Sequence, residues 1–279
     1  MRAWTDDDAS VLLQVRMAAL AGAPTPLLCP LEALWGLASP VAAPSVEAAA
    51  AALAAALVEQ REARVALVLG IDRDSGAFDV TAMRLQATHR LHPVPDAVRS
   101  VASLDAGFDG YLSRRTRKFR AGLRRDIAVG DSAGLRFQRV RLTPDTLPEV
   151  LQRLERVERH SWKTRAEAGI LEEPMWTFVR GVLARCAALG IGAAVFAARD
   201  GHDVGYLTGA LAEKRFRGLQ MSFDDALRSI GVGNLLQWAA LQWAIELGAD
   251  SYDLGSSMPY KARWAESSHT TAGFFAIAR

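Results

Sequence analysis

The sequence predicts an α/β protein with strands and helices in both halves. Half of its 279 residues are hydrophobic, which is ample for a sizeable core. Its second half follows a regular order: a strand, two helices, three strands, a glycine-containing loop, an apolar helix, a strand, a short segment and a last strand. The length allows one large domain or two closely packed ones.

The composition argues against several classes of protein. The formal net charge is only +2, so nothing global indicates nucleic-acid binding. The first 16 residues, "MRAWTDDDASVLLQVR", are acidic where an export signal is basic and then apolar, and no stretch is convincing as a membrane span. Cys29, Cys186 and the five histidines lack metal-ligand spacing. We therefore expect a cytoplasmic protein with buried thiols and no metal, and the alanine-rich runs are typical of a GC-rich bacterial genome.

The first half contains several local signals. Residues 11–20 predict a short helix, and the proline-rich stretch after them predicts an irregular wrapping segment. Ser45 is a credible N-cap for a helix over residues 45–63. Residues 64–72 and 76–85 predict two strands joined by the turn "DRDSG". The residues "HPVPD" predict a further break in the chain near residue 93.

A basic connecting helix is predicted over residues 105–130. Between Gly110 and Arg125 the chain carries seven basic residues and no acidic one. Phe119, Leu123 and Ile127 recur every four residues and form one apolar stripe. The basic side chains therefore spread over the remaining surface. They either form a solvated face or include arginines that face an anionic ligand, such as a phosphorylated cofactor, a nucleotide-linked substrate or RNA.

The second half has clearer element boundaries. Residues 134–142 predict a strand, and a helix follows with Thr143 as its N-cap and Pro144 at its first position. Another helix ends near Gly190. The remaining elements are three strands over 192–201, 203–214 and 216–226, a helix over 234–247, and strands over 251–256 and 270–279. The residues "RDGHD" predict a hairpin turn between the first two of the three strands.

The loop "RSIGVG", residues 228–233, comes after the third of the three strands and opens the apolar helix. The first N–H groups of a helix lack intrahelical partners and its dipole is positive there, so glycines at this point let an anion approach the backbone. The spacing alone is weak evidence, since such a pattern arises by chance about 0.7 times in a chain of this composition. It matches neither a P-loop nor a dinucleotide fingerprint, which needs a small residue at Leu236.

The element order with Arg228-x-x-Gly231-x-Gly233 resembles the GNAT superfamily of acyl-CoA-dependent N-acyltransferases. Three local motifs are similar to the branch with cellulose-biosynthesis acetyltransferases and, more distantly, Fem-type aminoacyl transferases: "YLSRRTRKFRAGLRRD" (111–126), "SWK" (161–163) and "YDLGSSMPYKARW" (252–264). The resemblance covers residues 105–279 well. It implies a mixed, mostly antiparallel sheet flanked by helices. The expected domains are a degenerate GNAT-like half of a tandem arrangement (1–104), the basic connecting helix (105–130) and an acyl-CoA-binding domain (131–279).

The resemblance also implies an activity. An acyl group, such as acetyl, would pass from coenzyme A to an amine of a small molecule, amino sugar or glycan precursor by direct attack in a ternary complex, with no covalent enzyme intermediate. The coenzyme A pyrophosphate would lie on the loop and the first turn of the helix. The expected cofactor-binding residues are Arg228, Ser229, Ile230, Gly231, Val232, Gly233 and Asn234.

Direct attack by an amine needs a base, an oxyanion stabiliser and an acid for the leaving group. Asp224 or Asp225 is the expected base, although the superfamily often has a glutamate on this strand, and Tyr260 is the expected acid. Asp253 could bind an amine or brace its loop, and Lys261 and Arg263 could face an anionic group or lie on the surface. The expected substrate-binding residues are His160, Trp162, Lys163, Asp253 and Lys261.

Two alternatives stay open. A Fem-like enzyme would take an aminoacyl group from tRNA, and the basic segment 114–125 would then contact RNA. A catalytically inactive member of the same fold would act as a binding protein. Apart from tRNA under the first alternative, we expect no nucleic-acid partner.

Overall fold

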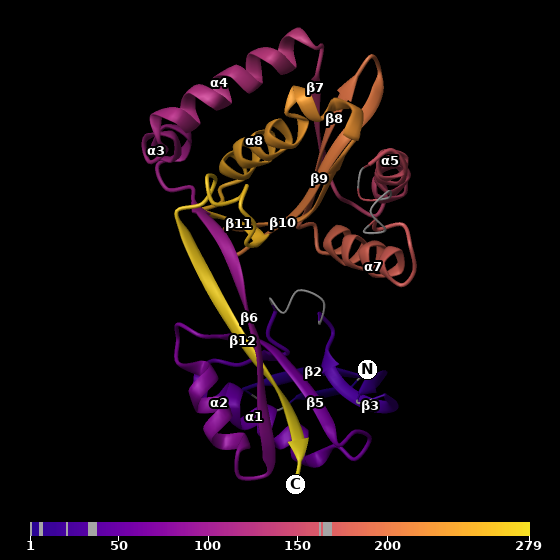
Figure 1. Cartoon of the computed structure of the whole chain (residues 1–279), viewed down its shortest axis with the longest axis vertical. Coiled ribbons are helices and arrows are strands. Elements are labelled where there is room, and N and C mark those ends of the chain that lie inside the picture. Colours follow the sequence, from indigo (N-terminus) through magenta and orange to yellow (C-terminus); the bar gives the residue numbers. More distant parts are fainter. Residues whose placement is uncertain (1, 6–7, 21, 33–37, 162, 164–168) are drawn as a thin grey trace. The chain divides into compact units, whose positions relative to one another are not determined.

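A computed structural model describes the chain except for residues 1, 6–7, 21, 33–37, 162 and 164–168. The chain divides into two compact units (Figure 1). The first unit is formed by Met1–Ser100, Ser256–Met258 and Ser267–Arg279, and the second by Val101–Gly255 and Pro259–Glu266. The C-terminal strand thus belongs to the first unit, whereas the sequence analysis placed it in the domain 131–279. That the first unit is a degenerate GNAT-like half stays a prediction.

The first unit is built on a mixed sheet with the strand order β1-β2-β3-β5-β12-β6, and β4 also pairs with β2. Only the β3–β5 pair is parallel among the strand pairs with a defined register. Two helices, α1 (Val46–Glu59) and α2 (Ala77–Leu85), contact each other and bury Leu53, Leu57 and Leu85 against the sheet. The strands are β1 (Arg2–Thr5), β2 (Ser10–Leu20), β3 (Ala23–Pro30), β4 (Val41–Ala42), β5 (Val65–Asp72), β6 (His89–Ser103) and β12 (Ser267–Ala278).

Two predictions for the first unit are confirmed. The Ser45 hydroxyl accepts a hydrogen bond from the Ala48 N–H at 3.1 Å and caps α1, and β5 forms where residues 64–72 predicted a strand. The helix nevertheless ends at Glu59 and not at residue 63.

Three other predictions for this unit are wrong. Residues 11–20 form β2 and not a helix, because Val11 and Leu13 alternate into the core and the strand pairs with β1 and β3. Residues 76–85 form α2 and not a strand, because Thr81 and Leu85 are buried at helical spacing. The proline-rich stretch includes β3 and β4 rather than being irregular throughout.

The second unit contains a sheet of strand order β11-β10-β9-β8-β7. β7 to β10 are antiparallel neighbours and β11 adds in parallel to β10, so the predicted mixed, mostly antiparallel sheet flanked by helices is confirmed. The strands are β7 (Arg136–Arg141), β8 (Gly192–Arg199), β9 (His202–Ala212), β10 (Arg215–Phe223) and β11 (Ser251–Ser256).

Helices cover both faces of this sheet (Figure 1). On one face α8 (Val232–Glu246) packs against β8, β9 and β10 and is itself covered by α3 (Gly107–Ser113) and α4 (Arg117–Ser132). On the other face lie α5 (Leu147–Arg159) and α7 (Met175–Ala188). Alternate residues of β8 separate the two cores, with Val195 facing α8 and Phe196 facing α5.

The structure corrects three helix boundaries in this unit. The basic segment 105–130 forms two helices and not one. The first, α3, ends at Ser113, and the Thr116 hydroxyl then caps α4 by accepting a hydrogen bond from the Phe119 N–H at 3.1 Å. α5 begins at Leu147 rather than Pro144, since the Thr143 and Thr146 hydroxyls each accept a hydrogen bond from the other residue's N–H. α8 begins two residues earlier than predicted, at Val232.

The apolar stripe predicted on the basic segment is confirmed, because Leu123 is buried in the α8-side core with Phe119 and Ile127 packed against it. Both cysteines are free and buried, as expected. Within the described residues, no helix is long and apolar enough to cross a membrane.

Candidate active site

The pairing of β10 with β11 ends early. The two strands are in parallel register only from Arg215 to Arg217, opposite Ser251 to Asp253, whereas β10 continues to Phe223. Beyond Arg217 the β10 edge is available to other groups, and the Met221 carbonyl accepts a hydrogen bond from Lys163 Nζ at 2.6 Å. Among the described residues, no strand pairs with this edge of β10 beyond Arg217.

Charged side chains gather where the pairing ends. Asp253 is buried, and its Oδ2 accepts from Arg217 Nη1 at 2.8 Å while its Oδ1 accepts from the Gly255 N–H at 2.8 Å. Gly255 has φ +77°, and a Cβ there would lie 3.7 Å from Lys261 Nζ and 4.0 Å from Arg217 Nη2. Asp253 thus braces the loop after its strand, and its binding of an amine stays a prediction.

Lys261 and Tyr260 lie next to this charged group. Burial and the neighbouring Arg217 lower the pKa of Lys261 to about 8. The Lys261 ammonium is 5.8 Å from the centroid of the Tyr260 ring. Burial raises the pKa of the Tyr260 phenol, which therefore keeps its proton at neutral pH. At neutral pH a charged Lys261, whose pKa is lowered, therefore lies beside the protonated Tyr260 phenol.

The two aspartates predicted as bases stand directly after β10. Asp224 is the N-cap of a 3₁₀ helix over Asp225–Ile230 and accepts from the Ala226 N–H at 2.9 Å. Asp225 accepts from Arg228 Nε at 3.0 Å. Both carboxylates stabilise this short helix, which the sequence did not predict, and their role as a base stays a prediction.

The "SWK" segment reaches the same end of β10. Ser161 forms a bridge with Asp224, and burial lowers the pKa of Lys163, whose ammonium is held on the Met221 carbonyl. His160 is exposed at the C-terminal cap of α5, with Nδ1 3.0 Å from the Arg156 carbonyl. Trp162 lies outside the described residues. The structure therefore brings Lys163, but not His160, to the unpaired β10 edge.

Both loop glycines have a structural reason. Gly231 has φ +78°, in the left-handed region that favours glycine, at the N-cap of α8. A Cβ on Gly233 would lie 2.9 Å from the Phe223 ring, so the glycine lets the end of β10 pack against the first turn of α8. The glycine spacing by itself is thus accounted for by chain geometry and packing.

A carboxylate stands at this loop. A Cβ on Gly231 would lie 3.6 Å from Asp126 Cγ, and Asp126 Oδ2 accepts from Asn234 Nδ2 at 2.9 Å. Asn234 Oδ1 in turn accepts a hydrogen bond from Arg263. A diphosphate bound on this loop would therefore lie near the Asp126 carboxylate, and like charges repel.

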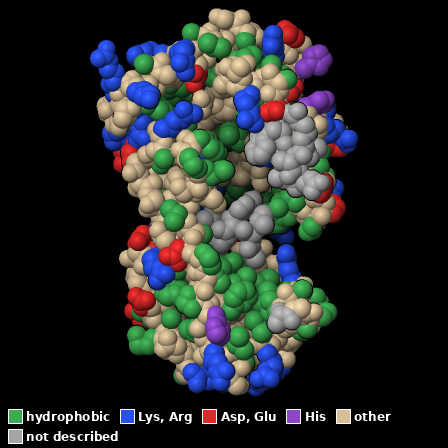
Figure 2. Space-filling view, in the orientation of Figure 1, with side chains coloured by type: hydrophobic (Ala, Val, Ile, Leu, Met, Phe, Trp, Pro, Cys, Tyr) green, Lys and Arg blue, Asp and Glu red, His purple; other side chains and the backbone are tan. Residues whose placement is uncertain are grey.

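Six of the seven basic residues of the connecting segment divide into two groups, and the seventh, Arg120, donates to the Leu112 and Arg115 carbonyls. Arg114 and Arg115 turn inward and form ion pairs with Glu266. On α4 the exposed basic residues share one face, two turns apart, and Lys and Arg side chains gather over this helix in Figure 2. They are Arg117, Lys118, Arg124 and Arg125. Contact of this face with RNA stays a prediction.

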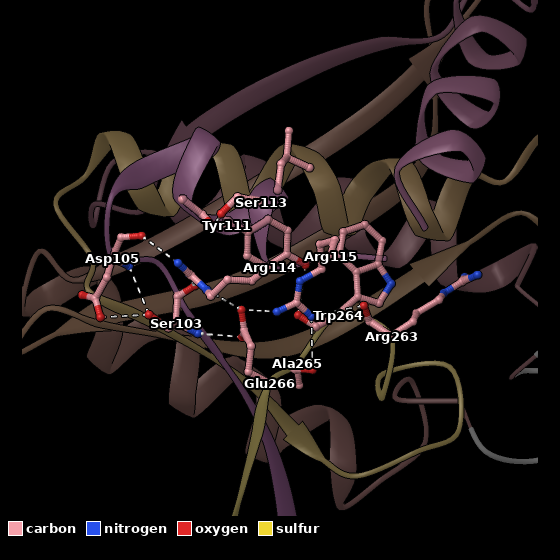
Figure 3. Close-up of polar contacts among 12 residues, drawn as sticks. Ser103, Asp105, Tyr111, Ser113, Arg114, Arg115, Arg263, Trp264, Ala265 and Glu266 are labelled. Atoms are coloured by element: carbon pink, nitrogen blue, oxygen red, sulfur yellow. Dashed lines mark hydrogen bonds and ion pairs between the residues drawn. The ribbon is translucent and has the colours of Figure 1, made fainter. Parts of the chain in front are cut away.

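The inward group holds the segment that carries Tyr260 and Lys261 (Figure 3). Arg115 Nη1 donates to the Ala265 carbonyl at 3.2 Å and to that of Arg263 at 3.4 Å. The Tyr111 hydroxyl donates to the Trp264 carbonyl at 3.0 Å, and the Arg115 guanidinium lies over the Tyr111 ring. Sequence reasoning missed this role of Arg115, because nothing in a run of seven basic residues separates it from its neighbours. It also missed Arg217 and Asp126.

The sheet order, the early end of the β10–β11 pairing and the glycine loop before α8 together define a GNAT-type transferase fold. The model of the acetyltransferase (GNAT) domain matches residues 117–262, and the chain belongs to this family. No curated protein matches the sequence significantly.

Several solved structures share the fold over the whole chain. The C-terminal domain of a putative lysylphosphatidylglycerol synthetase from Agrobacterium fabrum has a TM-score of 0.65 at 14% identity, and the match covers 100% of this chain and 84% of that one. FemX has a TM-score of 0.66 at 12% identity, with 99% and 87% covered. L-PGS from Bacillus licheniformis has a TM-score of 0.61 at 13% identity, with 100% and 84% covered. At these identities the likeness shows the fold alone.

Proposed function

We propose that this chain transfers an acyl group to an amine by direct attack, at the point where β10 and β11 cease to pair. The observation that carries this proposal is the unpaired β10 edge beyond Arg217, with Lys261 and Tyr260 beside it. An extended substrate can hydrogen-bond to such an edge through its amide groups. The family supports acyl transfer as the reaction class.

The reaction assigns a task to each group at the site. The amine nitrogen forms a bond to the acyl carbon, and the bond from that carbon to the leaving atom breaks. The attacking amine gives up a proton, for which Asp224 or Asp225 is the proposed acceptor. Tyr260, protonated at neutral pH, gives a proton to the leaving atom. The atoms and charges of this step balance without any oxidant or metal.

Lys261 and Arg217 are proposed to stabilise negative charge at the same place. Lys261 carries its charge below pH about 8. A Cβ on Gly255 would lie 3.7 Å from the Lys261 ammonium and 4.0 Å from the Arg217 guanidinium, so both cations lie close to the same position. Cations fixed where an oxyanion develops stabilise the transition state more than the ground state. Lys163, held on the edge of β10, is proposed to contact the acceptor together with Lys261.

The donor has two candidates. Acyl-coenzyme A is the donor that the sequence resemblance implied, with an amine of a small molecule, amino sugar or glycan precursor as the acceptor. An aminoacyl group carried by tRNA is the second candidate, and the Asp126 carboxylate at the α8 loop is the specific observation that favours it. The exposed cations of α4 would then contact the phosphates of the RNA.

A paired screen tests the proposal. The protein is incubated with a panel of amines and amino sugars, once with acetyl-coenzyme A and once with charged tRNA, and products are detected by mass spectrometry. We expect an acylated amine with one donor, and Tyr260→Phe should slow its formation at unchanged donor affinity. Strong salt dependence of an RNA complex would support the second donor. No product with either donor would contradict the proposal and favour an inactive binding protein.

A further inference from the structure

The N-terminal end of α8 is faced by a carboxylate of the chain itself. Asp126 belongs to α4, 108 residues away from its hydrogen-bond partner Asn234 in the first turn of α8. Its carboxyl group is 3.6 to 3.7 Å from the position of a Gly231 Cβ, and its side chain is only 19% exposed. Because a helix N-terminus carries unpaired N–H groups and a positive dipole, it stabilises an anion placed there. Asp126 is an anion at this end of α8, where it accepts a hydrogen bond from the Asn234 side chain.

The arginines around the loop also contact groups of the chain itself. Arg228, the basic residue of the loop motif, pairs with Asp225 at 3.0 Å. Arg125 lies 3.7 Å from Asp126, and Arg263 donates to the Asn234 amide oxygen. Of these contacts, the one from Arg263 to Asn234 joins two elements, α8 and the segment after β11, whereas the other two lie within the 3₁₀ helix and within α4. Each of the three arginines therefore already faces an acidic or amide group of the chain.

We infer that Asp126 is a residue that determines donor specificity. It takes the position of a donor phosphate at α8 and excludes donors that must place a diphosphate on this loop, coenzyme A thioesters among them. Donors that bind their anionic groups elsewhere, such as aminoacyl esters, are admitted. The inference rests on the proposed function only in that the chain uses an acyl donor at all.

The physical basis is the repulsion between like charges. A diphosphate on the first turn of α8 brings at least two negative charges beside a partly buried carboxylate, where water screens them less than at the surface. Removing that carboxylate while keeping its shape should therefore raise diphosphate affinity at least tenfold. Asparagine at position 126 does this, because its amide oxygen still accepts the hydrogen bond from Asn234.

The test measures binding and needs no turnover. Wild type, Asp126→Asn and Asp126→Ala are titrated calorimetrically with coenzyme A and with inorganic pyrophosphate. Asp131→Asn is the matched control, since it removes an exposed charge from the same helix, one turn beyond the loop. Thermal unfolding of each variant confirms that it is folded.

We expect wild type and Asp131→Asn to bind both ligands weakly, and Asp126→Asn to bind at least tenfold more tightly. The inference is overturned if Asp126→Asn binds neither ligand more tightly than wild type does. It is also overturned if Asp131→Asn gains as much affinity as Asp126→Asn. The two proposals fail separately. A gain in affinity without any acyl transfer would sink the proposed function and leave standing only that Asp126 excludes a diphosphate from this loop, and turnover without a gain would overturn the role of Asp126 and leave the proposed function standing.

Discussion

Replacing Glu266 by alanine should destabilise the second unit strongly. The carboxylate binds the Arg115 guanidinium, accepts from Arg114 Nε at 3.1 Å and accepts from the Ser103 N–H at 3.0 Å (Figure 3). The Arg115 side chain is only 5% exposed. Without Glu266 it would remain a buried cation whose described partners are the Ala265 and Arg263 carbonyls and the Tyr111 ring, none of them charged.

The magnitude follows from the burial of the two partners. Leaving a buried charge unpaired costs about 3–5 kcal/mol. Arg115 keeps the Ala265 and Arg263 carbonyls, and the Glu266 side chain is 24% exposed, so the loss should fall at the lower end, at about 3 kcal/mol. For a unit of this size that corresponds to a fall in Tm of roughly 6–12 °C.

Urea denaturation followed by tryptophan fluorescence measures this loss, since Trp264 is buried in the same network. Arg114→Ala is the control, because its ion pair with Glu266 is a third exposed and should contribute less than about 1 kcal/mol. The double variant Arg115→Met with Glu266→Ala should recover much of the stability. A loss below about 1 kcal/mol in Glu266→Ala, or simple additivity in the double variant, would refute the reasoning.

Three further predictions concern single residues. Turnover should fall as pH rises through about 8, because Lys261 then loses its charge. Lys261→Arg should move this fall to higher pH, and an unchanged pH–rate profile in that variant would argue against a role of Lys261 as a cation. Gly233→Ala should cost about 1–3 kcal/mol in thermal unfolding, because its Cβ meets the Phe223 ring at 2.9 Å, and a neutral effect would mean that the ring has room to move. Asp203→Ala should cost about 3–5 kcal/mol of stability in urea unfolding, since the buried Arg153 then loses the carboxylate that binds it at 2.7 and 2.8 Å. Asp203→Asn should cost less, and equal losses in the two variants would show that the charge of Asp203 is not the cause.

Local signals predicted the elements whose structure is set locally. The Ser45 cap, the hairpin turn before β9 and the apolar stripe of α4 depend on residues close in sequence, and each forms as expected. At that turn Asp200 and Gly201 both have positive φ, as tight hairpins require. Propensity and spacing are sufficient in such places because no distant partner competes.

The failures come from distant partners. Residues 11–20 become a strand because β1 and β3 supply hydrogen bonds to both edges, which no window of ten residues reveals. The prolines near residue 93 indicated a break, yet β6 runs through them from His89 to Ser103. In the candidate site the loop, Tyr260 and Lys261 stand in motifs, whereas Arg217 stands in none and meets Asp253 across 36 residues.

The loop motif shows why chemistry must be argued from contacts. Gly231 is required by its backbone conformation and Gly233 by the Phe223 ring, so both glycines would be selected even if no phosphate ever bound. What the fold supplies is a positive helix end, and a residue outside the motif decides whether that end faces a ligand or the chain itself. Here that residue is Asp126, on another helix. If Asp126 acts as we infer, donor choice depends on α4, the same helix that carries the exposed cations, and a variant of α4 should change donor binding while the glycine loop stays intact.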